Sequence, residues 1–440
     1  MYRKTKAIIL TSEIASFFIA FAVLLFAFGL ISRKISGTVI TAPMIFVAAG
    51  FLLSPAELDL VKLSSNSELV LIIAESALIL TLFSDASMLE QQVLFQEEKL
   101  PESLLFIALP LIIAFGALVA AFLFKDLTFA EAGLIGAMLS PTDASLGQAI
   151  VNSPKVPLKI RQSLNVESGL NDGGAIPFFL FFLILVSGEA LKQPVRTLFS
   201  LAFEQIGLGL IVGIAVGFLG GKLSKKAFLA GWTSGLYRKI GFMALAIVCW
   251  LAADSIGGSG FIAAFVGGLV TRLTNPSKHT EEEAILTEAE GGILSFAVFF
   301  IFGITIATKI FAITWPILFY AILNLTLIRM VPVAISVIGL HLHPKTILFL
   351  GWFGPRGLAS IVLLLIAMED IAGIGGSQTV NLVVITTVLL SVFIQGATAG
   401  PGSKIYARVV EALSSDAPEK KEVKEFSTGS NNTDAKKFVE

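Results

Sequence analysis

Charged residues are scarce in this chain, and cysteine and histidine are scarcer. Only 14% of the 440 residues are charged, where a soluble domain carries about 25%. A single cysteine excludes an internal disulfide, and one cysteine with three histidines makes no metal-ligand cluster. The net charge is −1 and no basic cluster with interleaved aromatics occurs, so we expect no nucleic-acid partner. Neither a zinc-protease motif nor a phosphate-binding loop is present, and no cofactor is expected.

Long apolar runs are what the sequence has in excess. Hydrophobic residues make up 55% of the chain, and its mean hydropathy is +0.87. The runs predict an all-α polytopic membrane protein with about thirteen transmembrane helices in the lipid bilayer. Approximate spans are 12–31, 38–54, 67–84, 102–124, 128–150, 161–187, 199–221, 236–254, 258–273, 290–307, 312–340, 345–368 and 378–400.

The loops between these spans indicate an orientation. With thirteen spans and the C-terminus inside, most loop Lys and Arg residues fall on the inner side, as the positive-inside rule requires. We therefore expect a multi-pass protein of the cell membrane with a cytoplasmic C-terminus. Residues 411–440 are rich in Lys, Glu, Ser and Asn, which predicts a short disordered tail. The shortness of this tail suggests a prokaryotic source.

The stretch VESGLNDGGAIP, residues 166–177, places charge inside a predicted span. An ionised carboxylate at bilayer depth costs roughly 3 to 15 kcal/mol, so its presence suggests a function. Glu167 and Asn171 are four residues apart and share one helix face, while Ser168 and Asp172 share the neighbouring face. The alternative, that these are helix ends in polar loops, fits poorly because apolar runs flank the stretch.

Two other spans are interrupted. The fifth is broken at Ser140–Asp143 and the twelfth at Gly351–Gly357. Gly/Pro-interrupted spans in corresponding places of two halves indicate a transporter with inverted repeats and a midplane site. Broken helices leave backbone N–H and C=O groups unpaired. We expect Asp143 to accept hydrogen bonds from N–H groups at helix N-termini, and Arg356 to compensate the negative C-terminal ends of the other half-helices.

Together, these residues resemble a known family. The motifs SPTDAS (140–145), ESGLNDGGAIP (167–177) and GPRGLAS (354–360), with Arg329 in the eleventh span, resemble the NhaP-type sodium/proton antiporters, the electroneutral branch of the monovalent cation:proton antiporters. The resemblance covers about residues 12–408. It implies a homodimer in which each subunit has two crossing discontinuous helices. It also implies an ion-carrying role for Asp172, an unwound pair at Thr142 and Asp143, and a pairing of Glu167 with Arg329.

The chemistry of these residues fits a monovalent cation. Na⁺ and Li⁺ prefer oxygen ligands, which Asp172, Asp143 and the hydroxyls of Ser168 and Thr142 supply. Burial disfavours the charged form of Asp172, so a cation and a proton compete for one carboxylate and exchange one for one.

The Glu167–Arg329 pair is expected to be a structural strut rather than a carrier, because the guanidinium keeps the carboxylate ionised. Asn171 is interpreted as the strut's hydrogen-bonding neighbour. Since asparagine cannot titrate, residue 171 supports electroneutral exchange.

A domain division also follows from the resemblance. Residues 1–410 are expected to form one transporter unit, with core helices mainly in 67–187 and 290–400 and dimerisation helices mainly in 12–54 and 199–273. A glycine occurs every fourth residue in the seventh span, at Gly209, Gly213, Gly217 and Gly221. This stripe fits either a subunit interface or packing within one subunit, and the resemblance favours the interface.

Several alternatives stay open from the residues alone. A K⁺/H⁺ antiporter would use the same mechanism, and a cation channel or an ion-coupled organic-anion carrier is also conceivable. Midplane carboxylates outnumber unpaired arginines, which favours a cationic substrate. The sequence GGSG at 257–260 matches an intramembrane serine protease superficially, but no histidine lies where a base is needed.

Overall fold

The computed structural model describes residues 2–35, 38–63, 67–88, 99–143, 145–147, 150, 153–190, 195–275, 278–414 and 417–420. Within these ranges every regular element is a helix, and no strand occurs. Among the described residues, nine helices are long and apolar enough to cross a membrane, and three shorter ones are also apolar. The prediction of an all-α multi-pass membrane protein is confirmed.

Helices occur at all thirteen predicted positions. The unbroken spans are α1 (Tyr2–Ile35), α2 (Ala42–Leu53), α3 (Glu68–Met88), α9 (Leu158–Ala190), α10 (Val195–Leu229), α11 (Gly235–Asp254), α12 (Gly260–Thr274) and α13 (Lys278–Ala307). The predicted breaks lie after α7 (Phe129–Met138) and between α16 (Pro344–Trp352) and α17 (Leu358–Asp370).

The remaining three spans each contain a π-helical turn. They are α5 (Lys99–Ser103)–η1 (Leu104–Ala108)–α6 (Leu109–Leu123), α14 (Trp315–Leu323)–η3 (Asn324–Ile328)–α15 (Arg329–Ser336), and α18 (Ser377–Leu390)–η4 (Ser391–Gln395)–α19 (Gly396–Glu411). The first two are the fourth and eleventh spans, seven apart, and the two broken spans are the fifth and twelfth. This spacing is typical of two repeats of one helical pattern.

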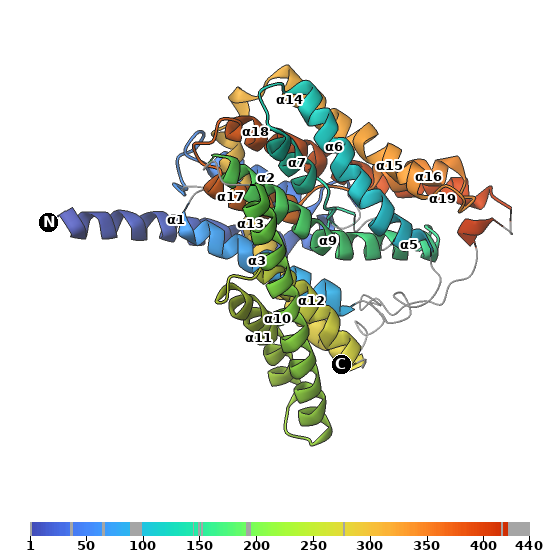
Figure 1. Ribbon diagram of the computed structural model, residues 1–440, viewed down its shortest axis with the longest axis horizontal. Helices are drawn as coiled ribbons and strands as arrows, with labels where there is room; N and C mark the ends of the chain where they lie inside the picture. Colours follow the sequence, from blue (N-terminus) through green and yellow to red (C-terminus); the bar gives the residue numbers. More distant parts are fainter. Residues whose placement is uncertain are drawn as a thin grey trace.

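Two parts of the chain extend from the body of the molecule (Figure 1). Helix α1 extends to one side, and α10 and α11 project together from another. Their outward side chains include large apolar residues, such as Phe26, Leu223 and Leu251, that are exposed in a single chain. In a membrane these side chains contact lipid or another subunit, so their exposure is not a defect of packing.

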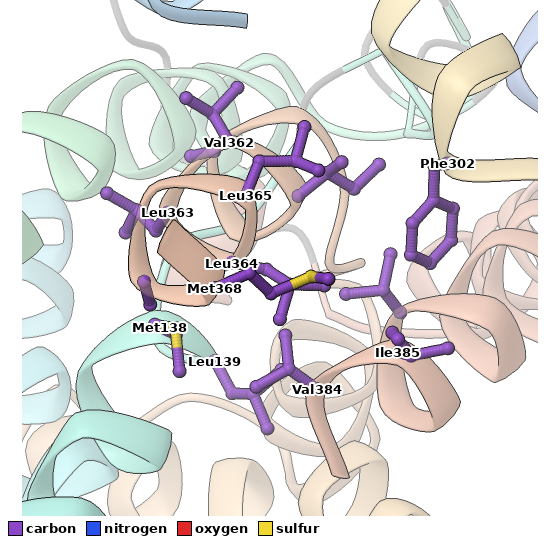
Figure 2. Close-up of a cluster of buried hydrophobic side chains, with 14 of the residues drawn as sticks. Met138, Leu139, Phe302, Val362, Leu363, Leu364, Leu365, Met368, Val384 and Ile385 are labelled. Carbon is purple, nitrogen blue, oxygen red and sulfur yellow. The ribbon is translucent and has the colours of Figure 1, made fainter. Parts of the chain in front are cut away.

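The apolar core surrounds α17. Figure 2 shows Leu364 and Met368 of α17 on the side of Leu139, at the end of α7, and of Val384 of α18. Leu363 lies on another side of α17, and Phe302 of α13 lies across the cluster. These side chains are almost completely buried. The second half of the twelfth span is therefore held by packing on several sides, and this gives the break before it a fixed position.

The glycine stripe of α10 packs against α12 of the same chain. A Cβ at Gly213 would lie 2.8 Å from the carbonyl oxygen of Ala263, and one at Gly217 would lie 2.5 Å from that of Gly267. The hydroxyl of Thr271 donates to the Gly217 carbonyl at 3.2 Å. The interpretation of this stripe as a subunit interface is therefore wrong, because its close approach is already used within one subunit.

The tail differs from expectation where it is described. Helix α19 continues to Glu411, and Pro418–Lys420 form a 3₁₀ turn, η5, in which Glu419 is only 1% exposed. The reason is a tertiary contact: the Glu419 carboxylate accepts the backbone N–H of His343 at 2.7 Å. The prediction of disorder is thus wrong for this turn, and residues 421–440 lie outside the described ranges.

Candidate functional site

The two helix breaks touch each other. The backbone N–H of Asp143 donates to the carbonyl of Pro355 at 2.7 Å, which joins the fifth span directly to the twelfth. Asp143 Oδ2 accepts the N–H of Leu358, the first residue of α17, at 2.8 Å. The carboxylate thus lies at the positive end of the α17 dipole. Asp143 Oδ1 accepts the N–H of Ser145 at 2.8 Å, so both of its oxygens are hydrogen-bonded.

Arginines lie at the C-terminal ends of the two interrupted helices. Arg356 Nη1 donates to the carbonyls of Ser140 and Pro141, at 2.9 and 3.2 Å, just beyond the end of α7. Arg329 Nε donates to Gly351 O at 3.2 Å, at the end of α16. A cation at a helix C-terminus offsets the negative end of its dipole. Each of the two half-helices that end within the molecule therefore has its own guanidinium.

Glu167 and Arg329 form a buried ion pair. Arg329 Nη2 lies 2.9 Å from Glu167 Oε1, and the two side chains are 1% and 3% exposed. Because Arg329 also donates to the end of α16, it ties α9 to the twelfth span. Gly354 is required beside it, since a Cβ there would overlap the guanidinium.

Helix α9 holds the first break through Thr142. Asn171 Nδ2 donates to Thr142 Oγ1 at 2.7 Å, and Asn171 Oδ1 accepts the Thr142 N–H at 3.2 Å. Ser168 Oγ donates to the Thr142 carbonyl at 2.7 Å. Asn171 was expected beside the Glu167–Arg329 pair; its amide group instead binds the unwound backbone, because residue 171 faces the break.

Asp172 lies on the same helix, α9, and is only 7% exposed. Within the described part of the chain its Oδ1 has no hydrogen bond. The acidic residues whose charges act on it are Asp85 of α3 and Asp143. Asp85 lies against α9 at Gly169, where a Cβ would be 4.0 Å from the Asp85 carboxyl carbon. Asp172 is therefore a buried carboxylate without an ion pair among the described residues, and its oxygens are suited to a hard cation.

A small cavity lies one helical turn from Asp172, beside Ser168. Its volume is about 20 Å³, which is room for one water molecule. It is lined by Thr142, Asp143, Gly147, Ile150, Leu164, Ser168, Phe353 and Pro355. Residues of both breaks and of α9 thus border one small, partly polar space.

Two residues that support the site were not expected from the sequence. Ser391 Oγ accepts the backbone N–H of Arg356 at 2.6 Å and donates to Gln395 Oε1 at 2.7 Å. Gln395 Nε2 donates to the Trp352 carbonyl at 2.7 Å. Both belong to the π-helical turn η4, and π-helical turns often occur at functional sites. The only sequence signal was a pair of polar residues within an apolar span.

The arrangement can bind a small hard cation through oxygen. Candidate ligands are Asp172, the hydroxyls of Ser168 and Thr142, the Thr142 carbonyl and Asp143, whose oxygens keep spare lone pairs. Three or more His, Cys, Asp or Glu side chains do not gather as a metal site anywhere in the described ranges. Ser259, in the protease-like GGSG, accepts the Ile262 N–H as the N-cap of α12, which explains this serine structurally.

The chain is similar to known proteins in sequence. The chain matches the family described as "Sodium/hydrogen exchanger, transmembrane" over residues 16–404. The K(+)/H(+) antiporter NhaP2 of Shewanella sp. (strain MR-4) is 25% identical over 289 residues, which is 65% of this chain and 49% of that protein. The Na(+)/H(+) antiporter of Schizosaccharomyces pombe is 26% identical over 283 residues, 60% of each chain. The chain thus spans about half the length of the NhaP2 relatives it matches.

A solved structure shares the fold. The sodium proton antiporter MjNhaP1 from Methanocaldococcus jannaschii, at pH 8, superposes with a TM-score of 0.72 and 17% sequence identity. The match covers 90% of this chain and 99% of that one. At this identity the likeness establishes the fold alone.

Proposed function

Because the chain belongs to the sodium/hydrogen exchanger family, we propose that it is a secondary active transporter that exchanges Na⁺ or Li⁺ for H⁺ across the cell membrane. One observation carries the proposal: Asp172 is buried, unpaired within the described residues, and one turn from Ser168 and the two helix breaks. The other four charged residues at the breaks, Asp143, Glu167, Arg329 and Arg356, are engaged by hydrogen bonds or an ion pair.

In this mechanism Asp172 is the ion carrier. A bound cation neutralises the carboxylate through direct coordination, and a bound proton neutralises it covalently, so only one can occupy it at a time. Ser168, Thr142 and Asp143 supply further oxygens to the cation. Neutralisation by either ion lets the loaded site cross the membrane without exposing an unpaired charge to the low-dielectric interior.

The pairs Glu167–Arg329 and Asn171–Thr142 keep this geometry. Glu167 makes a charge-assisted contact of 2.9 Å with the Arg329 guanidinium. Asn171 contributes an amide where a carboxylate would add a second exchangeable charge. One titrating carboxylate supports electroneutral one-for-one exchange.

The choice between Na⁺ and K⁺ depends on cavity size and ligand geometry more than on residue identity. The relatives are named for both ions, K(+)/H(+) for NhaP2 and Na(+)/H(+) for the fission yeast protein. We favour Na⁺ because the chain belongs to the sodium/hydrogen exchanger family. The second candidate is K⁺/H⁺ exchange by the same residues.

The assembly is part of the same proposal. Core helices mainly in 67–187 and 290–400 carry the site, and helices mainly in 12–54 and 199–273 form a homodimer. The exposed apolar side chains of α1, α10 and α11 are suited to this interface and to lipid. We place the C-terminus in the cytoplasm on the distribution of Lys and Arg.

The test is exchange in proteoliposomes containing a pH-sensitive dye, with Na⁺, Li⁺ and K⁺ added in turn at several pH values. We expect a saturable response to Na⁺ and Li⁺. Because protons occupy the same carboxylate, the half-saturating cation concentration should rise as pH falls, by up to about tenfold per pH unit where protonation dominates. A response to K⁺ alone would select the second candidate, and no response to any cation would contradict both.

A further inference from the structure

The two broken spans begin in the same way but with carboxylates from different places. At the start of α7 the N-cap is Thr128, and its backbone N–H donates to Glu131 Oε2 at 2.8 Å. Glu131 Oε1 also accepts the N–H of Gly376 at 2.9 Å, at the N-cap of α18. Glu131 is residue N3 of its own helix, so α7 has an ordinary capping box.

Helix α16 lacks a carboxylate at the equivalent residue. Its N-cap is His343, and residue N3 is Thr346 rather than Glu or Gln. The missing carboxylate comes from the tail. Glu419 Oε1 accepts the His343 N–H at 2.7 Å and the Thr346 hydroxyl at 3.0 Å. Glu419 therefore replaces, from 76 residues away in the sequence, the N3 carboxylate that α7 carries within itself.

The neighbouring residue of the tail binds a second helix end. Lys420 Nζ donates to the carbonyls of Glu411 and Leu413, where α19 ends. A carboxylate at one helix N-terminus and an ammonium at another helix C-terminus each complement the local dipole. The turn η5 also packs against α9, the helix of Asp172. These two residues thus fasten together the ends of α16 and α19 at one side of the molecule.

The position of α16 matters for the ion site because of what lies at its other end. There the carbonyls of Leu350 and Gly351 accept from Arg329, which pairs with Glu167 on α9. A helix of nine residues is about 13 Å long and moves as a rigid unit. An axial shift at His343 is therefore transmitted to Arg329.

We infer that Glu419 is a positioning residue for cation binding: it caps α16 from the tail and thereby fixes Arg329 and its partner Glu167 on α9, the helix that carries Asp172. The expected effect of Glu419 on transport rests on the proposed function. The turn Pro418–Lys420 thus stabilises the ion site from a distance, since none of its residues is expected to contact the cation.

The experiment uses the full chain and four variants: Glu419→Ala, Thr346→Glu, both together, and Glu411→Ala. Glu411 is the matched control, since its carboxylate is exposed and has no hydrogen bond within the described ranges. Amide hydrogen exchange of residues 343–353 is measured in detergent, and the half-saturating Na⁺ concentration in proteoliposomes. Thr346→Glu places a carboxylate at N3, to replace the one that Glu419→Ala removes.

For Glu419→Ala we expect amides at the start of α16 to exchange about tenfold faster, as befits loss of a charged hydrogen bond. The half-saturating Na⁺ concentration should rise roughly threefold or more, as it does when a group supporting an ion ligand is removed. The double variant should recover both values. Thr346→Glu alone should be worse than wild type, because two carboxylates then share one site.

Three results would overturn the inference: unchanged amide exchange in Glu419→Ala, failure of the double variant to recover, or faster amide exchange with an unaltered Na⁺ dependence. The last would make Glu419 a helix cap without influence on the ion site. If wild-type protein exchanged no cation for protons, the proposed function would fail, while the amide measurements would still decide whether Glu419 caps α16.

Discussion

Gly357 faces the carboxylate of Asp143 so closely that a Cβ on the glycine would overlap Asp143 Oδ2. The same oxygen accepts the N–H of Leu358 at 2.8 Å. The contact joins a carboxylate in the first break to the start of a helix after the second. The two interruptions are thus a single structural unit, and neither can be rebuilt without the other.

Replacing Gly357 by alanine should separate the two breaks. Overpacking costs about 1–3 kcal/mol, and loss of the Asp143–Leu358 hydrogen bond adds to it, so we expect a melting temperature several degrees lower and exchange reduced about tenfold. Thermal unfolding in detergent and proteoliposome transport measure the two effects. Gly375→Ala is the control, because a Cβ there meets no atom within 4 Å; equal behaviour of the two variants would refute the contact.

Glu167→Gln should destabilise the protein strongly. Removing one partner of a buried ion pair leaves Arg329 uncompensated, at a cost of about 3–5 kcal/mol. The exposed pair Asp59–Lys62 is a matched control: its charged atoms are also close, at 2.8 Å, but its side chains are 55% and 56% exposed. Asp59→Asn should therefore leave the thermal stability almost unchanged, because solvent screens an exposed ion pair. A Glu167→Gln protein with wild-type stability and transport would contradict the strut.

The packing of α10 on α12 makes a prediction that separates it from a subunit interface. Gly217→Val would force side-chain atoms against the Gly267 carbonyl, so we expect lower thermal stability of the individual subunit, by about 1–3 kcal/mol. Gly207→Val on the same helix should have little effect, since a Cβ at Gly207 would have no atom within 4 Å. Native mass spectrometry provides the alternative readout. Dissociation of an oligomer without loss of subunit stability would restore the interface interpretation.

Asn171→Ala should loosen the first break. The variant loses both hydrogen bonds to Thr142 and leaves a buried N–H unsatisfied, which costs about 1–3 kcal/mol. Because Thr142 contributes oxygen to the proposed site, the half-saturating Na⁺ concentration should rise as well. Asn381→Ala is the comparison, since in the described part of the chain Asn381 Oδ1 accepts no hydrogen bond. Equal Na⁺ dependence in both variants would argue against the role of Asn171.

Patterns of hydropathy were sufficient to predict the helices, and Gly/Pro clusters to predict the breaks. The apolar runs correspond to helices because lipid requires every backbone group to be paired within the span. The breaks at Ser140–Asp143 and Gly351–Gly357 were visible because proline and glycine interrupt helices by local chemistry. Such features depend on neighbouring residues only.

Features that depend on distant residues could not be predicted in the same way. The hydrogen bonds of Arg329 to α16 and of Asn171 to Thr142 join segments 22 and 29 residues apart. The sequence SVFIQ (391–395) contains no pattern that predicts a π-helical turn. A Lys/Glu-rich tail likewise does not indicate that one of its glutamates caps a helix. For the glycines of α10, the sequence predicted close approach but not which helix approaches.

The central claim is that Asp172 alone carries the exchanged ions. The most direct test is Na⁺-driven proton movement in proteoliposomes containing wild type or Asp172→Asn, with and without a potassium–valinomycin clamp of the membrane potential. The account predicts that wild type shows saturable exchange that is the same with and without the clamp. Asp172→Asn should show no exchange, although it folds and inserts because asparagine is nearly isosteric with aspartate and uncharged. Exchange that persists in Asp172→Asn, with a similar dependence on Na⁺, would contradict it.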